Sequence, residues 1–124
     1  MDEIRLRLPG KARYLPVAHL VLGGLGSRLD LTVEGLEDLK LAIDSLVERT
    51  REGDHVTIAV RLENGTLRTE VGPFDDDVLR AQLAEQPGVG LRRILNAVVD
   101  GVEVWSDDDS TWVTLSKTIG GKAR

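Results

Sequence analysis

A glycine pair late in the chain has the build of an anion-binding loop. Gly88-Val89-Gly90-Leu91 opens an amphipathic stretch, and Arg92 and Arg93 follow it directly. A Gly-x-Gly at a helix N-terminus presents free N–H groups and the positive end of the helix dipole to an anion. This pattern predicts a phosphate site formed by Gly88, Val89, Gly90, Leu91 and Arg92. The alternative is a glycine-rich entry to an ordinary helix, because a lone Gly-x-Gly is weak evidence for phosphate binding.

Four side chains in the segment 44–49 are the second candidates for chemistry. Asp44 and Glu48 are four residues apart, so a helix places them on one face, where they could serve as a base and a metal ligand. Ser45 and Arg49 have the same spacing. However, a hydroxyl cannot act as the general base, and a guanidinium cannot ligate Mg²⁺. The apolar residues of this helix define its buried face, and Asp44 and Glu48 do not belong to that face. We therefore interpret Asp44 and Glu48 as ordinary solvated acids.

The remaining titratable residues form no recognisable catalytic or metal-binding pattern. The chain has no cysteine and two histidines, which are too few for a convincing metal cluster. His19 lies on an otherwise apolar helix and is expected to be a half-buried structural residue. His55 opens a strand and is expected to be exposed. The acidic turn at 107–109 is read as a solubility feature, so we expect no metal site.

The segment Leu36-Glu37-Asp38-Leu39-Lys40-Leu41-Ala42-Ile43-Asp44-Ser45-Leu46-Val47-Glu48-Arg49, with the later Gly88–Leu91 box, resembles the histidine-kinase-like (GHKL, Bergerat-fold) ATPases. Within them, the closest branch is the bacterial anti-sigma-factor serine kinases. The resemblance extends from Ile4 to Thr118. That family places a catalytic Glu and a magnesium-binding Asn four residues apart on this helix. Counting seven residues on from Asp38, the position of the Glu falls on Ser45, and the position of the Asn falls on Arg49. The resemblance thus implies a scaffold for ATP and Mg²⁺ without its catalytic residues, so we assign no catalytic residue.

The same resemblance implies a weakened adenine site. The family's strand runs here into Asp-x-Gly-x-Gly, whose Asp reads the adenine amino group. This chain passes from Val71 directly to Gly72-Pro73-Phe74-Asp75, so the Asp and one Gly are missing. We expect Gly72-Pro73-Phe74 to be only a turn. Selectivity for adenine over other bases should be poor, because a site that recognises its ligand by hydrogen bonds loses that selectivity when one of the bonding groups is absent. The Gly88–Leu91 box corresponds to the loop that holds the triphosphate.

Composition restricts the class of protein. The chain has 124 residues, 41% hydrophobic and 30% charged, which is typical of one globular domain. A net charge of −5 argues against direct nucleic-acid binding and against anionic membranes. The N-terminus lacks the build of a signal peptide. We expect a cytoplasmic protein with one domain at 1–119 and a flexible tail at 120–124.

Hydrophobic periodicity predicts the elements that position these residues. Strict alternation indicates a strand at 4–8, and Asn64-Gly65 indicates a hairpin between strands 56–62 and 67–71. Helices are expected at 14–29, from Thr32 or Glu34 to 52, at 78–85 and at 89–99, with a final hairpin of strands 102–105 and 111–115. Trp105 and Trp112 should pack across that hairpin. Gly23, Gly24 and Gly26 weaken the first helix, so close neighbours should support them.

This order of elements predicts an α+β fold, a two-layer α/β sandwich with helices on one face of a mixed, mostly antiparallel sheet. The predicted function is that of an anti-sigma-factor-like regulator, which binds a sigma factor or an antagonist protein by partner switching and often dimerises in this family. An active ATP-dependent serine/threonine kinase is the first alternative, with Asp44 or Glu48 as its carboxylate. A non-enzymatic anion- or protein-binding module is the second.

Overall fold

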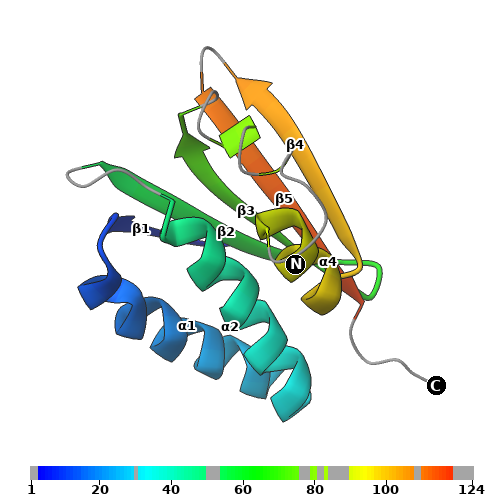
Figure 1. Ribbon diagram of the computed structural model, residues 1–124. Helices are drawn as coiled ribbons and strands as arrows, with labels where there is room; N and C mark the ends of the chain where they lie inside the picture. Colours follow the sequence, from blue (N-terminus) through cyan, green and yellow to red (C-terminus); the bar gives the residue numbers. More distant parts are fainter. Residues whose placement is uncertain are drawn as a thin grey trace.

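The fold is built on a five-stranded antiparallel sheet, which forms one of its two layers (Figure 1). The computed structural model describes residues 3–29, 31–49, 54–75, 79–80, 83, 90–107 and 110–118. The strand order is β1-β2-β3-β5-β4, and each described pair of neighbours is antiparallel. The strands are β1 (Ile4–Pro9), β2 (His55–Glu63), β3 (Thr66–Phe74), β4 (Gly101–Asp107) and β5 (Ser110–Thr118).

The described helices lie together on one face of this sheet, which confirms the predicted two-layer α+β sandwich (Figure 1). A short 3₁₀ turn, Ala12–Tyr14, leads into α1 (Leu15–Arg28), and α2 (Val33–Val47) and α4 (Leu91–Val98) follow. Thr32 caps α2, because its hydroxyl accepts a hydrogen bond of 2.9 Å from the Gly35 N–H. The predicted helix at 78–85 falls mostly outside the described residues. Leu79, Arg80 and Leu83 within it are helical.

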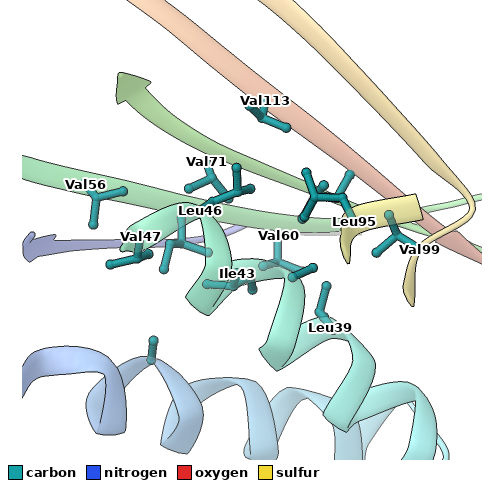
Figure 2. Close-up of a cluster of buried hydrophobic side chains, with 14 of the residues drawn as sticks. Leu39, Ile43, Leu46, Val47, Val56, Val60, Val71, Leu95, Val99 and Val113 are labelled. Carbon is teal, nitrogen blue, oxygen red and sulfur yellow. The ribbon is translucent and has the colours of Figure 1, made fainter. Parts of the chain in front are cut away.

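An aliphatic core fills the space between the helices and the sheet (Figure 2). One side of α2 presents Leu39, Ile43 and Leu46 to it, each at most 1% exposed. Alternate residues of the strands point back toward them, and Leu95 joins from α4. The core residues labelled in Figure 2 on the sheet and beside α4 are Val56, Val60, Val71, Val99 and Val113. The low aromatic content of the sequence is consistent with this packing.

Lys117 joins three elements at one end of the sandwich. Its Nζ donates a hydrogen bond of 2.9 Å to the carbonyl of Val98 at the end of α4, and lies 3.5 Å from the Asp38 carboxylate of α2. A cation at a helix C-terminus is favoured by the helix dipole. Because its side chain is only 15% exposed, this contact fixes α2 and α4 over β5.

The Asn64-Gly65 hairpin is confirmed, and its backbone explains the residue choice. Both residues have positive φ, 50° and 79° respectively, which is the geometry of a type I′ turn. Glu63 and Thr66 pair on either side, so the loop has two residues. The register of β2 on β3 is therefore set locally.

The prediction that Gly72-Pro73-Phe74 is a turn is wrong. These residues continue β3 to its end, although the pairing with β5 shifts between Val71 and Phe74. Proline cannot donate to a sheet ladder, and it is tolerated at such an irregularity. Gly72 is needed for a different reason: a Cβ there would lie 2.7 Å from the Trp112 ring.

The glycines of α1 also differ from expectation. Only Gly26 has the predicted close neighbours, since a Cβ there would meet Leu31 and Leu36 at 3.4 Å. A Cβ at Gly23 or Gly24 would meet nothing within 4 Å. Those two glycines lie on the outer surface of α1, which no described part of the chain covers.

Candidate functional site

Ser45 and Arg49, which the resemblance places at the positions of a catalytic Glu and a magnesium-binding Asn, lie at the C-terminal end of α2. Ser45 is 6% exposed, because it follows the apolar stripe of the helix into the protein. Arg49 lies just beyond the helix, and its Nη1 donates a hydrogen bond of 2.7 Å to the Ser45 carbonyl. A helix leaves its last four carbonyls without backbone partners, and Arg49 satisfies one of them. The guanidinium therefore caps its own helix.

Asp44 faces a different neighbour. Its two carboxylate oxygens lie 2.8 and 3.0 Å from Nε2 of His19, on the adjacent helix α1. Both side chains are about one-third exposed, 28% and 33%. Asp44 is thus not the freely solvated acid that the sequence suggested, whereas Glu48 is exposed as expected. His19 is half-buried, as predicted, and its pairing with Asp44 was not foreseen.

The predicted phosphate loop is described only in part. Gly88 and Val89 lie outside the described residues. Gly90 is the N-terminal cap of α4 and supplies no side chain to that end of the helix. Leu91 is fully buried, so its side chain belongs to the core. Arg92 is exposed, and its Nε donates a hydrogen bond of 3.3 Å to the Leu83 carbonyl.

Aliphatic side chains fill the region between α2, β3 and α4 (Figure 2). Val71 from β3, Leu46 from α2 and Leu95 from α4 gather there. Among the core residues that the structure describes, the Thr69 hydroxyl is fully buried and has no hydrogen-bond partner. The sequence contains no signal for this role of Thr69, because alternation along β3 marks it only as an inward-facing position.

The opposite, uncovered face of the sheet carries a hollow of about 460 Å³. Arg7, Thr57 and Pro73 line it, together with His55 at the first position of β2 and Asp54 just before that strand. His55 is exposed at the first position of its strand, as predicted. Because Arg7 and Thr57 pair on the face away from the helices, this hollow lies across the sheet from α2 and α4.

Metal and membrane signals are absent from the described residues. Within those ranges, no three His, Cys, Asp or Glu side chains gather as a metal site would require. No described helix has the length and apolar character needed to cross a bilayer. Asp107 is exposed, and the other two acids of its turn lie outside the described residues.

Comparison with known proteins identifies relatives of the whole chain. A Bacillus mycoides protein named serine-protein kinase RsbW is 27% identical over an alignment covering 95% of this chain and 86% of the relative. A Bacillus cereus protein of the same name is 29% identical over the same shares. This chain is similar to the RsbW serine-protein kinases along nearly its full length. No family model matches the chain.

A solved structure supports the same fold as the RsbW relatives. The RsbU and RsbW domains of a Mycobacterium tuberculosis protein superpose with a TM-score of 0.71 at 17% identity, covering all of this chain. This chain spans 34% of that longer one, so the similarity concerns the fold of one domain.

The alignment with the RsbW kinases also reveals a difference in length. It extends over 140 residues, which exceeds the 124 residues of this entire chain. The relatives therefore carry residues within the aligned region that this chain lacks.

Proposed function

We propose that this protein is an anti-sigma-factor-like regulator that works by binding other proteins, on an ATPase scaffold that has lost phosphotransfer. The observation that carries the proposal is the similarity to the RsbW kinases over nearly the whole chain. The resemblance places Ser45 and Arg49 at the catalytic positions, which supports the loss of phosphotransfer. A fold can be retained while its site chemistry changes, because function depends on particular residues.

The chemistry of the two positions supports the loss of activity. General acid–base help is worth about 10²–10⁴-fold in rate, and Ser45 is nearly buried and cannot supply it. Arg49 brings a positive charge to the place of a magnesium ligand, and its guanidinium is engaged by the Ser45 carbonyl.

The proposed partners are a sigma factor, an antagonist protein of the partner-switching type, or both, in the cytoplasm. A second copy of this chain is a further proposed partner. The outer surface of α1 is a suitable contact region for a partner protein, because Leu20 is 79% exposed and Val17 is 44% exposed. Arg28 adds a positive charge at the C-terminal end of the same helix, more than two turns beyond Leu20. Exposed apolar groups of this size are typical of protein contacts when they gather.

An active serine kinase is the first alternative, and it requires a carboxylate near Mg²⁺. Asp44 is turned toward α1 and held by His19, whereas Glu48 is exposed at the helix end. A non-enzymatic module that binds an anion at Gly90 is the second alternative. It is favoured by the free N–H groups at the start of α4, which no side chain caps.

Two measurements separate these possibilities. Incubation with radiolabelled Mg-ATP and candidate antagonist proteins should give no serine phosphorylation above background, whereas affinity capture with the sigma factors of the source organism should retain at least one. Robust label transfer that Asp44→Asn or Glu48→Gln abolishes would establish the kinase instead. Capture of no sigma factor and no antagonist would overturn the regulatory proposal.

A further inference from the structure

The hollow on the sheet face away from the helices gathers polar side chains whose hydrogen-bonding groups are unused. Its volume of about 460 Å³ is within the range of small-molecule sites. Arg7 of β1, Thr57 of β2 and Ser110 of β5 line it, together with Asp54 and His55 where β2 begins. In the part of the chain that the structure describes, none of these five side chains makes a hydrogen bond or an ion pair. The hollow therefore offers both donors and acceptors to a ligand.

Arg7 differs from the other arginines described on this face, because no described acid pairs with it. Arg5, two residues earlier on the same strand, pairs with Glu3 at 2.8 Å. Arg61 of β2 and Arg68 of β3 each pair with an acid, at 2.8 and 2.7 Å. A guanidinium holds a carboxylate through two parallel N–H···O bonds. The donors of Arg7 are therefore available for a carboxylate that comes from outside the chain.

Arg7 and Asp54 bring opposite charges to the same hollow without forming an ion pair with each other. The backbone fixes where each of them starts. Arg7 lies opposite Thr57 in the register of β1 on β2. Asp54 lies beyond the end of that pairing, where its carbonyl accepts a hydrogen bond of 2.7 Å from the Gly10 N–H. Two opposite charges held at separate points of one hollow are suited to a ligand that carries both charges.

The balance of charge around the hollow discriminates between classes of ligand. Among the described residues that line it, Arg7 contributes one positive charge, and Asp54 and Asp75 contribute one negative charge each. With His55 neutral, the lining is negative overall. A phosphate dianion would therefore meet more repulsion than attraction there. A ligand with one carboxylate and one or two ammonium groups matches both signs and is favoured by the net charge.

We propose that this hollow binds a free amino acid, and that basic amino acids bind best. The ligand's carboxylate lies on the Arg7 guanidinium, and an ammonium group lies against Asp54. The hydroxyls of Thr57 and Ser110 can each donate or accept a hydrogen bond, and Pro73 provides an apolar surface for methylene groups. Because the hollow is open to solvent, we expect a dissociation constant on the order of 1 mM. This site is independent of the sigma-factor assignment.

Trp112 lies next to the hollow and can report its occupancy. A Cβ at Gly72 would meet the Trp112 ring, and Gly72 pairs with Thr57 of the hollow. Trp112 stacks on Trp105 across β4 and β5, as the sequence predicted, with ring centroids 5.7 Å apart and planes 14° from parallel. The Trp105 N–H donates a hydrogen bond of 2.8 Å to the Thr114 hydroxyl. A ligand should therefore shift the NMR signals of the Trp112 indole and of the backbone amides at the start of β2.

Two-dimensional NMR titration of the full chain with L-lysine tests the proposal. L-lysine should shift these signals, whereas L-glutamate and inorganic phosphate should bind at least about tenfold more weakly. Arg7→Ala should weaken L-lysine binding by about tenfold or more, since it removes a charge-assisted hydrogen-bonded pair. Cadaverine, which is lysine without its carboxylate, should bind equally to the wild type and to Arg7→Ala, because neither complex contains that pair. Asp54→Asn should weaken the binding of L-lysine but not that of acetate.

Arg5→Ala provides the matched control, because it removes the same charge from the same face of β1, at an arginine that already pairs with Glu3. It should change L-lysine binding by less than about threefold, since an exposed charge outside the hollow is screened by salt. Circular dichroism melting of each variant confirms that it is folded. Three results would overturn the proposal: no shifts around the hollow at millimolar L-lysine, equal L-lysine binding by Arg7→Ala and the wild type, or tighter binding of phosphate than of L-lysine.

Discussion

At the scale of single residues, Thr69 is a polar group that the fold leaves without a partner. Its hydroxyl is fully buried among aliphatic side chains and makes no hydrogen bond. Replacing such a group by an apolar one of the same shape removes a desolvation cost, so Thr69→Val should stabilise the protein by about 1 kcal/mol. Urea unfolding measures the change. Thr57→Val, on the half-exposed open face, is the control and should have little effect; a loss of stability for Thr69→Val would show that the hydroxyl has a partner.

Asp44 provides a second test at the residue scale, because it separates a structural role from a catalytic one. A partly exposed His–Asp pair contributes less than about 1 kcal/mol, so Asp44→Asn should lower the unfolding free energy only slightly. The loss should be smaller in a His19→Gln background, which a double-mutant cycle measures. Full additivity of the two changes would show that the 2.8 Å contact does not contribute to stability.

At the scale of elements, two glycines in different environments should respond oppositely to alanine. In β3, Gly72→Ala places a methyl 2.7 Å from the Trp112 ring, and overpacking of this kind costs about 1–3 kcal/mol. In α1, Gly23→Ala meets nothing within 4 Å and should gain about 0.5–1 kcal/mol from helix propensity. Thermal unfolding of both variants, followed by tryptophan fluorescence, reports the two effects. Equal changes at the two sites would contradict this account of the β3–Trp112 packing.

At the scale of the whole molecule, the scaffold should bind anions without reading the base. ATP, GTP and pyrophosphate should bind with similar, weak affinity, because the start of α4 offers N–H groups, while the chain lacks the Asp that the resemblance would require for reading adenine. Gly90→Val should remove this binding, since a branched side chain blocks approach to the backbone. Calorimetric titration measures both. Tight ATP binding with clear rejection of GTP would show that another residue reads the base.

Partner capture with Gly90→Val completes this test at the molecular scale. We expect the surface that binds the protein partner to be independent of the start of α4. The Gly90→Val variant should therefore bind its protein partner as the wild type does. Loss of partner binding together with anion binding would mean that the two regions are coupled through α4.

Short-range patterns predicted most of the elements correctly. The alternation of β2 and β3 and the Asn64-Gly65 turn depend on residues adjacent in the chain, so no tertiary information was required. The apolar stripe of α2 and its cap at Thr32 are equally local. The Gly72-Pro73-Phe74 segment was misjudged for the opposite reason: β3 is held between two neighbours, and this pairing outweighs the turn preference of Gly-Pro.

For the candidate site, too, some properties follow from the sequence and others only from the tertiary structure. Residue types alone determined that Ser45 and Arg49 cannot supply a base or a magnesium ligand, because that conclusion depends on side-chain chemistry. Only the tertiary structure decided that Asp44 meets His19, 25 residues away along the chain. The tertiary structure likewise decided that the Thr69 hydroxyl is buried without a hydrogen-bond partner. It also decided that Gly72 leaves room for the Trp112 ring. Such contacts arise from helix-on-helix packing, helix-on-sheet packing and the pairing of strands distant in sequence, which join segments whose separation in the chain carries no periodic signal.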